Sequence, residues 1–216
     1  MGRYIVAVTG ASGAIYARTL IAALCRVGHA VDLMVSAAGF AVLAHETDWE
    51  DARYAGEHGM ASRCRRFFLP EGAPGSLRFH PIHDISGELA SGSASVDGMV
   101  VIPCTMGRVA AIAGGRSTDL LERCADVTLK EGRRLVVVPR ETPLSLIHLR
   151  NLTALCEAGA VVLPAMPGFY HGPRCVDDLA AFVAAKVLSR LGLDDAARTL
   201  LPPWEGPARR TQGTAL

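Results

Sequence analysis

The 216-residue sequence lacks a long uninterrupted apolar run and has almost no net charge. No stretch reaches the roughly 18 consecutive apolar residues that span a bilayer. The apolar segment from Arg3 to Cys25 is interrupted by Gly10, Gly13 and Arg18, whereas a secretory signal needs a continuous apolar core. We therefore expect a cytoplasmic protein without membrane association, and the formal net charge of +1 gives no reason to expect a nucleic-acid partner.

Several motifs of metal and hydrolase chemistry are also missing. The six cysteines form no C-x-x-C pair and no histidine stands at zinc-finger spacing, so we expect reduced thiols and no bound metal. The G-x-S-x-G elbow of serine hydrolases is absent as well. Asp177-Asp178 resembles the start of a magnesium-binding motif, but no second acidic cluster faces it and it opens a predicted helix. We interpret the pair as a helix cap.

What the sequence has in abundance is apolar residues, which make up half of the chain at a mean hydropathy of +0.27. Burial between subunits is one explanation of this excess. Apolar, β-branched runs alternate with helical patterns, which is typical of parallel strands joined by right-handed crossovers. We predict a single-domain, flavodoxin-like (Rossmann-like) doubly wound parallel α/β sheet over residues 1–206, followed by a short polar tail at 207–216.

The predicted elements follow from apolar runs, helical spacing and turn residues. Strands are predicted at 4–9, 30–35, 98–102, 134–138 and 160–163. Helices are predicted at 15–27, from Ser36 onward, at about 118–130, at 144–158 and at about 176–191.

A glycine-containing turn, Thr9 to Ala14, joins the first strand to the first helix. Glycine allows close backbone approach and a helix N-terminus offers unpaired N–H groups, a combination that holds phosphate. However, Tyr16 stands where a dinucleotide-binding motif has its third glycine, and Ser36 stands where that motif has its ribose-binding acid. The pattern disfavours an NAD enzyme, and a purely structural tight turn remains an alternative for this motif.

Small, polar or charged residues follow every predicted strand. These segments are Gly10–Ser12, Ser36, Pro103–Arg108, Pro139–Glu141 and Pro164–Tyr170. Because ligands of doubly wound sheets bind beyond the carboxyl ends of the strands, we expect the five segments to converge on one crevice.

Cations accompany these segments. Arg123 and Lys130 are seven residues apart on a predicted helix and so share one face. With Arg140 they suggest a phosphate or pyrophosphate site, although a solvated helix face would explain the first two equally well. Tyr170 lies in a loop rich in proline and glycine, where it either donates a hydrogen bond to a phosphate or packs against the protein.

Six motifs together resemble the flavin prenyltransferases of the UbiX type. They are Gly10–Tyr16, His45–Asp48, Pro103–Thr105, Ala125–Glu131, Pro139–Leu144 and Pro167–His171. They occur in the order of that family and extend the resemblance from Arg3 to Trp204.

The resemblance implies a flavodoxin-like fold and a homododecamer. It implies reduced FMN and dimethylallyl monophosphate, or in some members the diphosphate, as substrates. The flavin N5 attacks the allylic carbon as phosphate leaves, and a second bond, to C6, closes a fourth ring. The product would be prenylated FMN, the cofactor of UbiD-type decarboxylases, and no metal would be needed.

The resemblance also assigns residues. FMN would be bound by Gly10, Ala11, Ser12, Ser36, Ser91, Ser93, Thr105, Met106, Gly107, Arg108 and Arg140. Dimethylallyl phosphate would be bound by Arg123, Lys130, Arg140, Glu141, Tyr170, Lys186 and Trp204. Catalytic roles would fall to Ser12, Glu46, Lys130, Glu141 and Tyr170, with Glu141 handling protons. The sequence departs from the family at Ala94, often Phe, at Gly172, often basic, and at the additional basic residues Arg108 and Arg116.

Two other functions compete with this one. Cysteine-decarboxylating flavoproteins share the fold and FMN, but their early catalytic histidine and their Asn-bearing segment are not found here. A flavin carrier subunit of a decarboxylase would not need an allylic-phosphate site, so Lys130, Arg140, Glu141 and Tyr170 argue against it.

Overall fold

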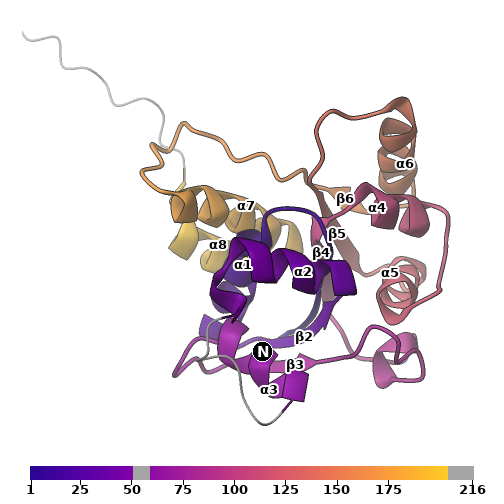
Figure 1. Ribbon diagram of the computed structural model, residues 1–216, viewed down its shortest axis with the longest axis horizontal. Helices are drawn as coiled ribbons and strands as arrows, with labels where there is room; N and C mark the ends of the chain where they lie inside the picture. Colours follow the sequence, from indigo (N-terminus) through magenta and orange to yellow (C-terminus); the bar gives the residue numbers. More distant parts are fainter. Residues whose placement is uncertain (51–58, 204–216) are drawn as a thin grey trace, which may run out of the picture.

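The computed structural model describes residues 1–50 and 59–203 (Figure 1). Within them, one parallel sheet of six strands has the order β3-β2-β1-β4-β5-β6. The strands are β1 (Arg3–Val8), β2 (Ala30–Val35), β3 (Ser76–Phe79), β4 (Gly98–Cys104), β5 (Arg134–Pro139) and β6 (Val161–Val162). The predicted doubly wound parallel sheet is confirmed. Its order is the flavodoxin arrangement with β3 added beside β2, which is the order of dinucleotide-binding sheets.

Helices cover both faces of the sheet. They are α1 (Ala14–Arg26), α2 (Ala37–Glu46), α3 (Gly59–Phe68), α4 (Met106–Ala113), α5 (Leu120–Lys130), α6 (Leu146–Glu157), α7 (Val176–Leu191) and α8 (Asp194–Leu200), with the short 3₁₀ helices η1 (Asp48–Glu50) and η2 (Glu88–Ala90). Figure 1 shows α7 and α8 on one side of the strands and α4, α5 and α6 on the other.

The core has two halves because successive residues of a strand face opposite sides of the sheet. Val6 and Val8 of β1 join the cluster that contains α1 and α7, whereas Ile5 and Ala7 join the cluster that contains α4 and α5. All seven residues of β4 are buried. This explains why the sequence reads as continuous apolar runs rather than as an alternating pattern.

Local details support several of the sequence interpretations. Asp178 accepts hydrogen bonds from the backbone N–H groups of Arg174 (2.7 Å) and Cys175 (3.3 Å), so it caps α7 as predicted. All six cysteines are free thiols. In the two described ranges, no helix combines the length and the apolar character that crossing a membrane requires.

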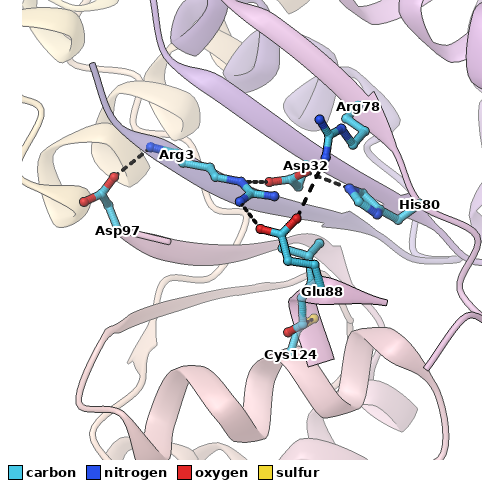
Figure 2. Close-up of polar contacts among 8 residues, drawn as sticks. Arg3, Asp32, Arg78, His80, Glu88, Asp97 and Cys124 are labelled. Atoms are coloured by element: carbon cyan, nitrogen blue, oxygen red, sulfur yellow. Dashed lines mark hydrogen bonds and ion pairs between the residues drawn. The ribbon is translucent and has the colours of Figure 1, made fainter. Parts of the chain in front are cut away.

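One charged residue lies inside the sheet layer. The Asp32 side chain on β2 is only 4% exposed and accepts hydrogen bonds from Arg3 Nε at 2.6 Å and from His80 Nε2 at 2.7 Å (Figure 2). Burial alone would raise the pKa of Asp32, but His80 and Arg3 hold it below its usual value. The carboxyl group therefore remains ionised inside the protein.

We expect the free energy of unfolding to fall at acidic pH. The pKa of Glu122 is also lowered: burial would raise it, but hydrogen bonds from Thr118 and the charge of Arg108 outweigh that effect. Because the folded-state pKa values of Asp32 and Glu122 are depressed, ionisation stabilises the fold above the unfolded-state pKa of about 4. That stabilisation disappears as the pH falls through the folded-state values. Urea denaturation between pH 7 and pH 3 checks this, and a constant free energy across that interval would contradict it.

Candidate functional site

A pocket of about 250 Å³ lies beyond the carboxyl ends of β1, β2 and β4. It is lined by Thr9, Gly10, Ser36, Ala37, Ala38, Ile82, His83, Thr105, Arg108 and Asp119. The strand order reverses direction between β1 and β4, and doubly wound sheets bind ligands at such a switch point. The first three predicted strand-end segments therefore do meet at one crevice.

Two helices begin at this pocket. Ser36 caps α2 by accepting a hydrogen bond from Gly39 N at 3.0 Å, and Thr105 caps α4 by accepting one from Arg108 N at 3.3 Å. Thr9 links the two strand ends, because its hydroxyl donates to Pro103 O at 2.8 Å and accepts from Thr105 N at 2.9 Å. Two helix N-termini pointing at one pocket favour an anion there, such as a phosphate.

The glycine-containing turn before α1 contacts a carboxylate of the same chain. Gly13 N and Ala14 N donate hydrogen bonds to Glu46 Oε2 at 2.8 and 3.1 Å, and the Ser12 hydroxyl bonds the same carboxylate. A carboxylate from α2 therefore engages two N–H groups of the α1 N-terminus, which argues against a phosphate at those groups. The N-termini of α2 and α4 face the pocket instead, and the FMN contacts expected of Gly10, Ala11 and Ser12 stay predictions.

Glu46 is an anion in this arrangement. Burial alone would raise the pKa of Glu46, but the hydrogen bonds from Ser12, Gly13 and Ala14, together with the charge of Arg140, hold it below its usual value. Glu46 therefore accepts protons rather than donating them at neutral pH. This places two of the predicted catalytic residues, Ser12 and Glu46, in direct hydrogen bonding.

Arg140 adds a positive charge to the same end of the sheet. It follows β5, its backbone N–H donates to Cys104 O at 3.2 Å, and its charge acts on Glu46 and Tyr16. Its Nε is buried and has no hydrogen-bond partner within the described ranges. A buried unpaired donor is costly, so this group fits a ligand acceptor. Tyr16 lies close enough to Arg140 and Glu46 for their charges to act on it, a position that sequence reasoning did not identify.

Arg108 lines the pocket but its guanidinium is engaged elsewhere. Its Nη2 contacts Asp119 and its Nη1 contacts Glu122, both at 2.6 Å, and these carboxylate side chains are 10% and 4% exposed. The additional basic residue Arg108 therefore neutralises two buried carboxylates, of which Asp119 lines the pocket, and mainly its backbone is left for a ligand. The Met106 side chain is buried in the core, so a ligand would contact its backbone as well.

A second group of predicted residues gathers at α7. The Tyr170 and Phe182 rings are 5.6 Å apart, and Lys186 Nζ lies 5.5 Å from the centre of the Phe182 ring. Tyr170 and Lys186 line a pocket of about 200 Å³ that extends along α8 to Pro203. Tyr170 thus packs against an aromatic ring while half of its side chain stays exposed. Trp204, the next predicted residue, lies outside the described residues.

Four more predicted residues, Arg123, Lys130, Ser91 and Ser93, lie on α5 and on the connection that packs against it. Lys130 precedes the amino end of β5 and Arg140 follows its carboxyl end, and a strand of this length spans roughly 20 Å. Arg123 Nε donates to Ala90 O at 3.0 Å, and the hydroxyls of Ser91 and Ser93 are 2.7 Å apart. Within a single chain, the length of β5 therefore separates Lys130 from Arg140, and the ligand contacts expected of Arg123, Lys130, Ser91 and Ser93 stay predictions. These four residues follow the flank of α5, which runs back toward the amino edge of the sheet.

Comparisons with known proteins agree with this geometry. A family model described as Flavoprotein matches residues 2–187. The flavin prenyltransferase UbiX of Synechocystis sp. is 45% identical over 202 residues, covering 94% of this chain and 95% of the relative. The flavin prenyltransferase UbiX of Pseudomonas aeruginosa is 43% identical over 205 residues, covering 94% and 93%.

Solved structures give the same result. The chain superposes on AnUbiX (PadA1) in complex with FMN and dimethylallyl pyrophosphate with a TM-score of 0.80 at 36% identity, covering 95% of this chain and 98% of that one. A dodecameric FMN-dependent Ubix-like decarboxylase from Escherichia coli O157:H7 gives 0.76 at 37% identity, with 89% and 95% covered. The chain belongs to the flavoprotein family and, within it, to the flavin prenyltransferases of the UbiX type.

Proposed function

We propose that this protein joins a dimethylallyl group from dimethylallyl phosphate to N5 and C6 of reduced FMN. The observation that carries the proposal is the pocket at the switch point of the sheet. There the N-termini of α2 and α4, capped by Ser36 and Thr105, meet at one pocket. Arg140 lies at the same end of the sheet, and its buried Nε has no hydrogen-bond partner among the described residues. The relatives that share this architecture at 36–45% identity are flavin prenyltransferases over nearly the whole chain.

The pocket fits FMN as a substrate. The N-termini of α2 and α4, with Gly10, Ala11 and Gly107, would hold the phosphate and the chain that leads to it. Ser12, Glu46 and Arg140 would face the isoalloxazine ring, because Ser12 hydrogen-bonds Glu46 and the charge of Arg140 acts on the same carboxylate. When bound, reduced FMN supplies the nucleophile, so the protein itself needs no nucleophilic side chain.

Replacing Gly10 with alanine is expected to weaken FMN binding about tenfold or more. A Cβ at position 10 would lie 2.5 Å from the Cβ of Ala38, and neither atom can turn aside, so the turn and the start of α2 must separate. Fluorescence titration of FMN measures the affinity. Gly87→Ala is the matched control, because its nearest neighbour would be at 3.4 Å. An unchanged affinity in Gly10→Ala would contradict the position of the site.

The allylic substrate needs positive charge around its leaving phosphate. Preorganised cations stabilise a departing dianion without a metal, and Arg123, Lys130, Arg140 and Lys186 supply four. In one chain these cations stand at three places, so we infer that the α5 flank of one copy completes the crevice of another. Symmetric assemblies provide such shared sites, and a dodecameric relative exists.

Exposed apolar side chains support association between copies. Ile147 on α6 is 67% exposed, and Phe169 in the loop beside Tyr170 is 71% exposed. Apolar side chains on the outside of a monomer mark contact surfaces when they gather in patches. Leu146, next to Ile147 in the sequence, and Met166, three residues before Phe169, are exposed as well. We infer a homododecamer whose prenylated product serves a UbiD-type decarboxylase, with the enzyme in the cytoplasm.

An anaerobic incubation tests the function directly. The purified protein, reduced FMN and dimethylallyl monophosphate should yield a flavin heavier by one C5 unit in a mass spectrum. Parallel incubations with the diphosphate establish which donor is preferred. Recovery of unchanged FMN alone would favour a flavin carrier, and oxidative decarboxylation of a peptidyl cysteine would favour the cysteine-decarboxylating flavoproteins. One of these, TvaF, shares only the fold at 15% identity.

A further inference from the structure

The connection between β3 and β4 crosses one face of the sheet and is fixed on both sides. We call its residues Glu88–Ser93 the strap. On the sheet side, Arg3 Nη1 pairs with Glu88 at 2.5 Å while Arg3 Nε holds Asp32 (Figure 2). The buried charge of Asp32 thus fixes Arg3, and Arg3 fixes the start of the strap.

The opposite side of the strap is tied to α5 and the turn that follows it. Arg123 Nε donates to Ala90 O at 3.0 Å, the Cys124 thiol to Leu89 O at 3.4 Å, and Arg133 Nη2 to Gly92 O at 2.7 Å. These three hydrogen bonds from side chains to strap carbonyl groups leave the strap little freedom. Its end therefore has a set position relative to the last turn of α5, which carries Lys130.

Lys130 rests against that end. Its Nζ pairs with Glu131 at 2.7 Å, and a Cβ added to Gly92 would lie 3.0 Å from Lys130 Nζ and 2.2 Å from Glu131 Oε1. The two side chains are 47% and 35% exposed, and a lysine in that environment ordinarily samples many rotamers. Here the bare backbone of Gly92 on one side and a carboxylate on the other restrict the ammonium group.

We propose that Gly92 and Glu131 are positioning residues that hold the Lys130 ammonium group in the orientation at which it meets the phosphate of the allylic substrate. The inference rests on the proposed function and adds two residues to it. Gly92 contributes by having no side chain, and Glu131 contributes a tether. Neither touches the reacting atoms, so both act through Lys130.

Gly92→Ala is the direct test. Its φ is not in the left-handed region, so alanine fits the backbone, and the displaced atoms are the ends of two flexible side chains rather than the core. We expect kcat/KM for dimethylallyl monophosphate to fall roughly 10- to 100-fold, the loss typical of a misplacement of about 1 Å. FMN affinity and Tm should match the wild type, and Gly87→Ala in the same connection should change nothing. Wild-type kinetics in Gly92→Ala, or an equal loss of FMN binding, would overturn the proposal.

Glu131→Gln separates positioning from charge balance. If Glu131 tethers Lys130, kcat falls in this variant. If Glu131 only offsets the positive charge of Lys130, removing its carboxylate in Glu131→Gln strengthens phosphate binding. KM then falls at an unchanged kcat, and the proposal fails. Calorimetric binding of dimethylallyl monophosphate to the FMN-loaded protein gives a readout without turnover: Gly92→Ala should bind it at least about tenfold more weakly. A wild type that binds both ligands but yields no prenylated flavin would overturn the proposed function and leave the positioning measurable.

Discussion

Replacing Arg108 with alanine is expected to lower the free energy of unfolding by about 3–5 kcal/mol. Arg108 spans two carboxylates, Asp119 and Glu122, that are almost completely buried. Without the guanidinium, two negative charges face each other in the pocket wall, where water screens them poorly. Urea denaturation at pH 7 measures the loss. The same variant should bind FMN more weakly, because Asp119 lines the pocket and its unneutralised charge repels a phosphate.

A matched variant distinguishes the loss of charge neutralisation from the loss of side-chain packing. In Arg108→Met with Asp119→Asn and Glu122→Gln, the volume stays close to that of the wild type and no charge remains, so most of the lost stability should return. Asp195 forms an ion pair with Arg198 in full solvent exposure, and Asp195→Ala should cost almost nothing. A loss below about 1 kcal/mol in Arg108→Ala would contradict the idea that the two carboxylates depend on this guanidinium.

The sequence predicted the fold well where strands are fully buried. The apolar runs at 30–35 and 134–138 became β2 and β5 almost residue for residue, because both faces of these strands are covered and nearly all of their positions are apolar; the exceptions are the ion-paired Asp32 and the exposed Arg134. The edge strand β3 went unpredicted, since only Leu77 of its four residues is buried. A four-residue segment with one buried side chain is too short for its apolar pattern to distinguish a strand from a loop.

The site was predictable only where a local sequence pattern determines the contact. A serine or threonine directly after a buried strand and before a helix predicts a cap, and Ser36 and Thr105 are both caps. The bond from Gly13 to Glu46 joins residues 33 positions apart, and no local pattern contains that contact. The position of Lys130 could have been inferred: a helix that precedes a strand ends at the amino edge of the sheet, which is the edge opposite the crevice.

Lys130→Ala and Glu141→Gln are each expected to reduce prenylation by about 10²–10³-fold, since each removes a preorganised group at the reacting centre. Lys130 would lose its charge at the leaving phosphate, and Glu141, the only carboxylate between Pro139 and Leu144, would lose its capacity to accept a proton. FMN affinity should persist in both variants because neither residue lines the pocket at the switch point. Single-turnover rates at saturating FMN check these values. Wild-type rates in either variant would remove that residue from the site.

Mixing the two inactive variants tells which chain supplies which residue. If Lys130 serves the crevice of a neighbouring copy, a mixed assembly contains crevices that draw an intact Glu141 from one variant and an intact Lys130 from the other. Random assembly of equal amounts makes about a quarter of the crevices complete, so co-expressed and co-purified mixtures should recover about that fraction of wild-type activity. If both residues served their own chain, every crevice would lack one of them. The mixture would then be no more active than its components. We expect recovery instead, because roughly 20 Å of β5 separates the two groups within a chain and a second copy can bring them together.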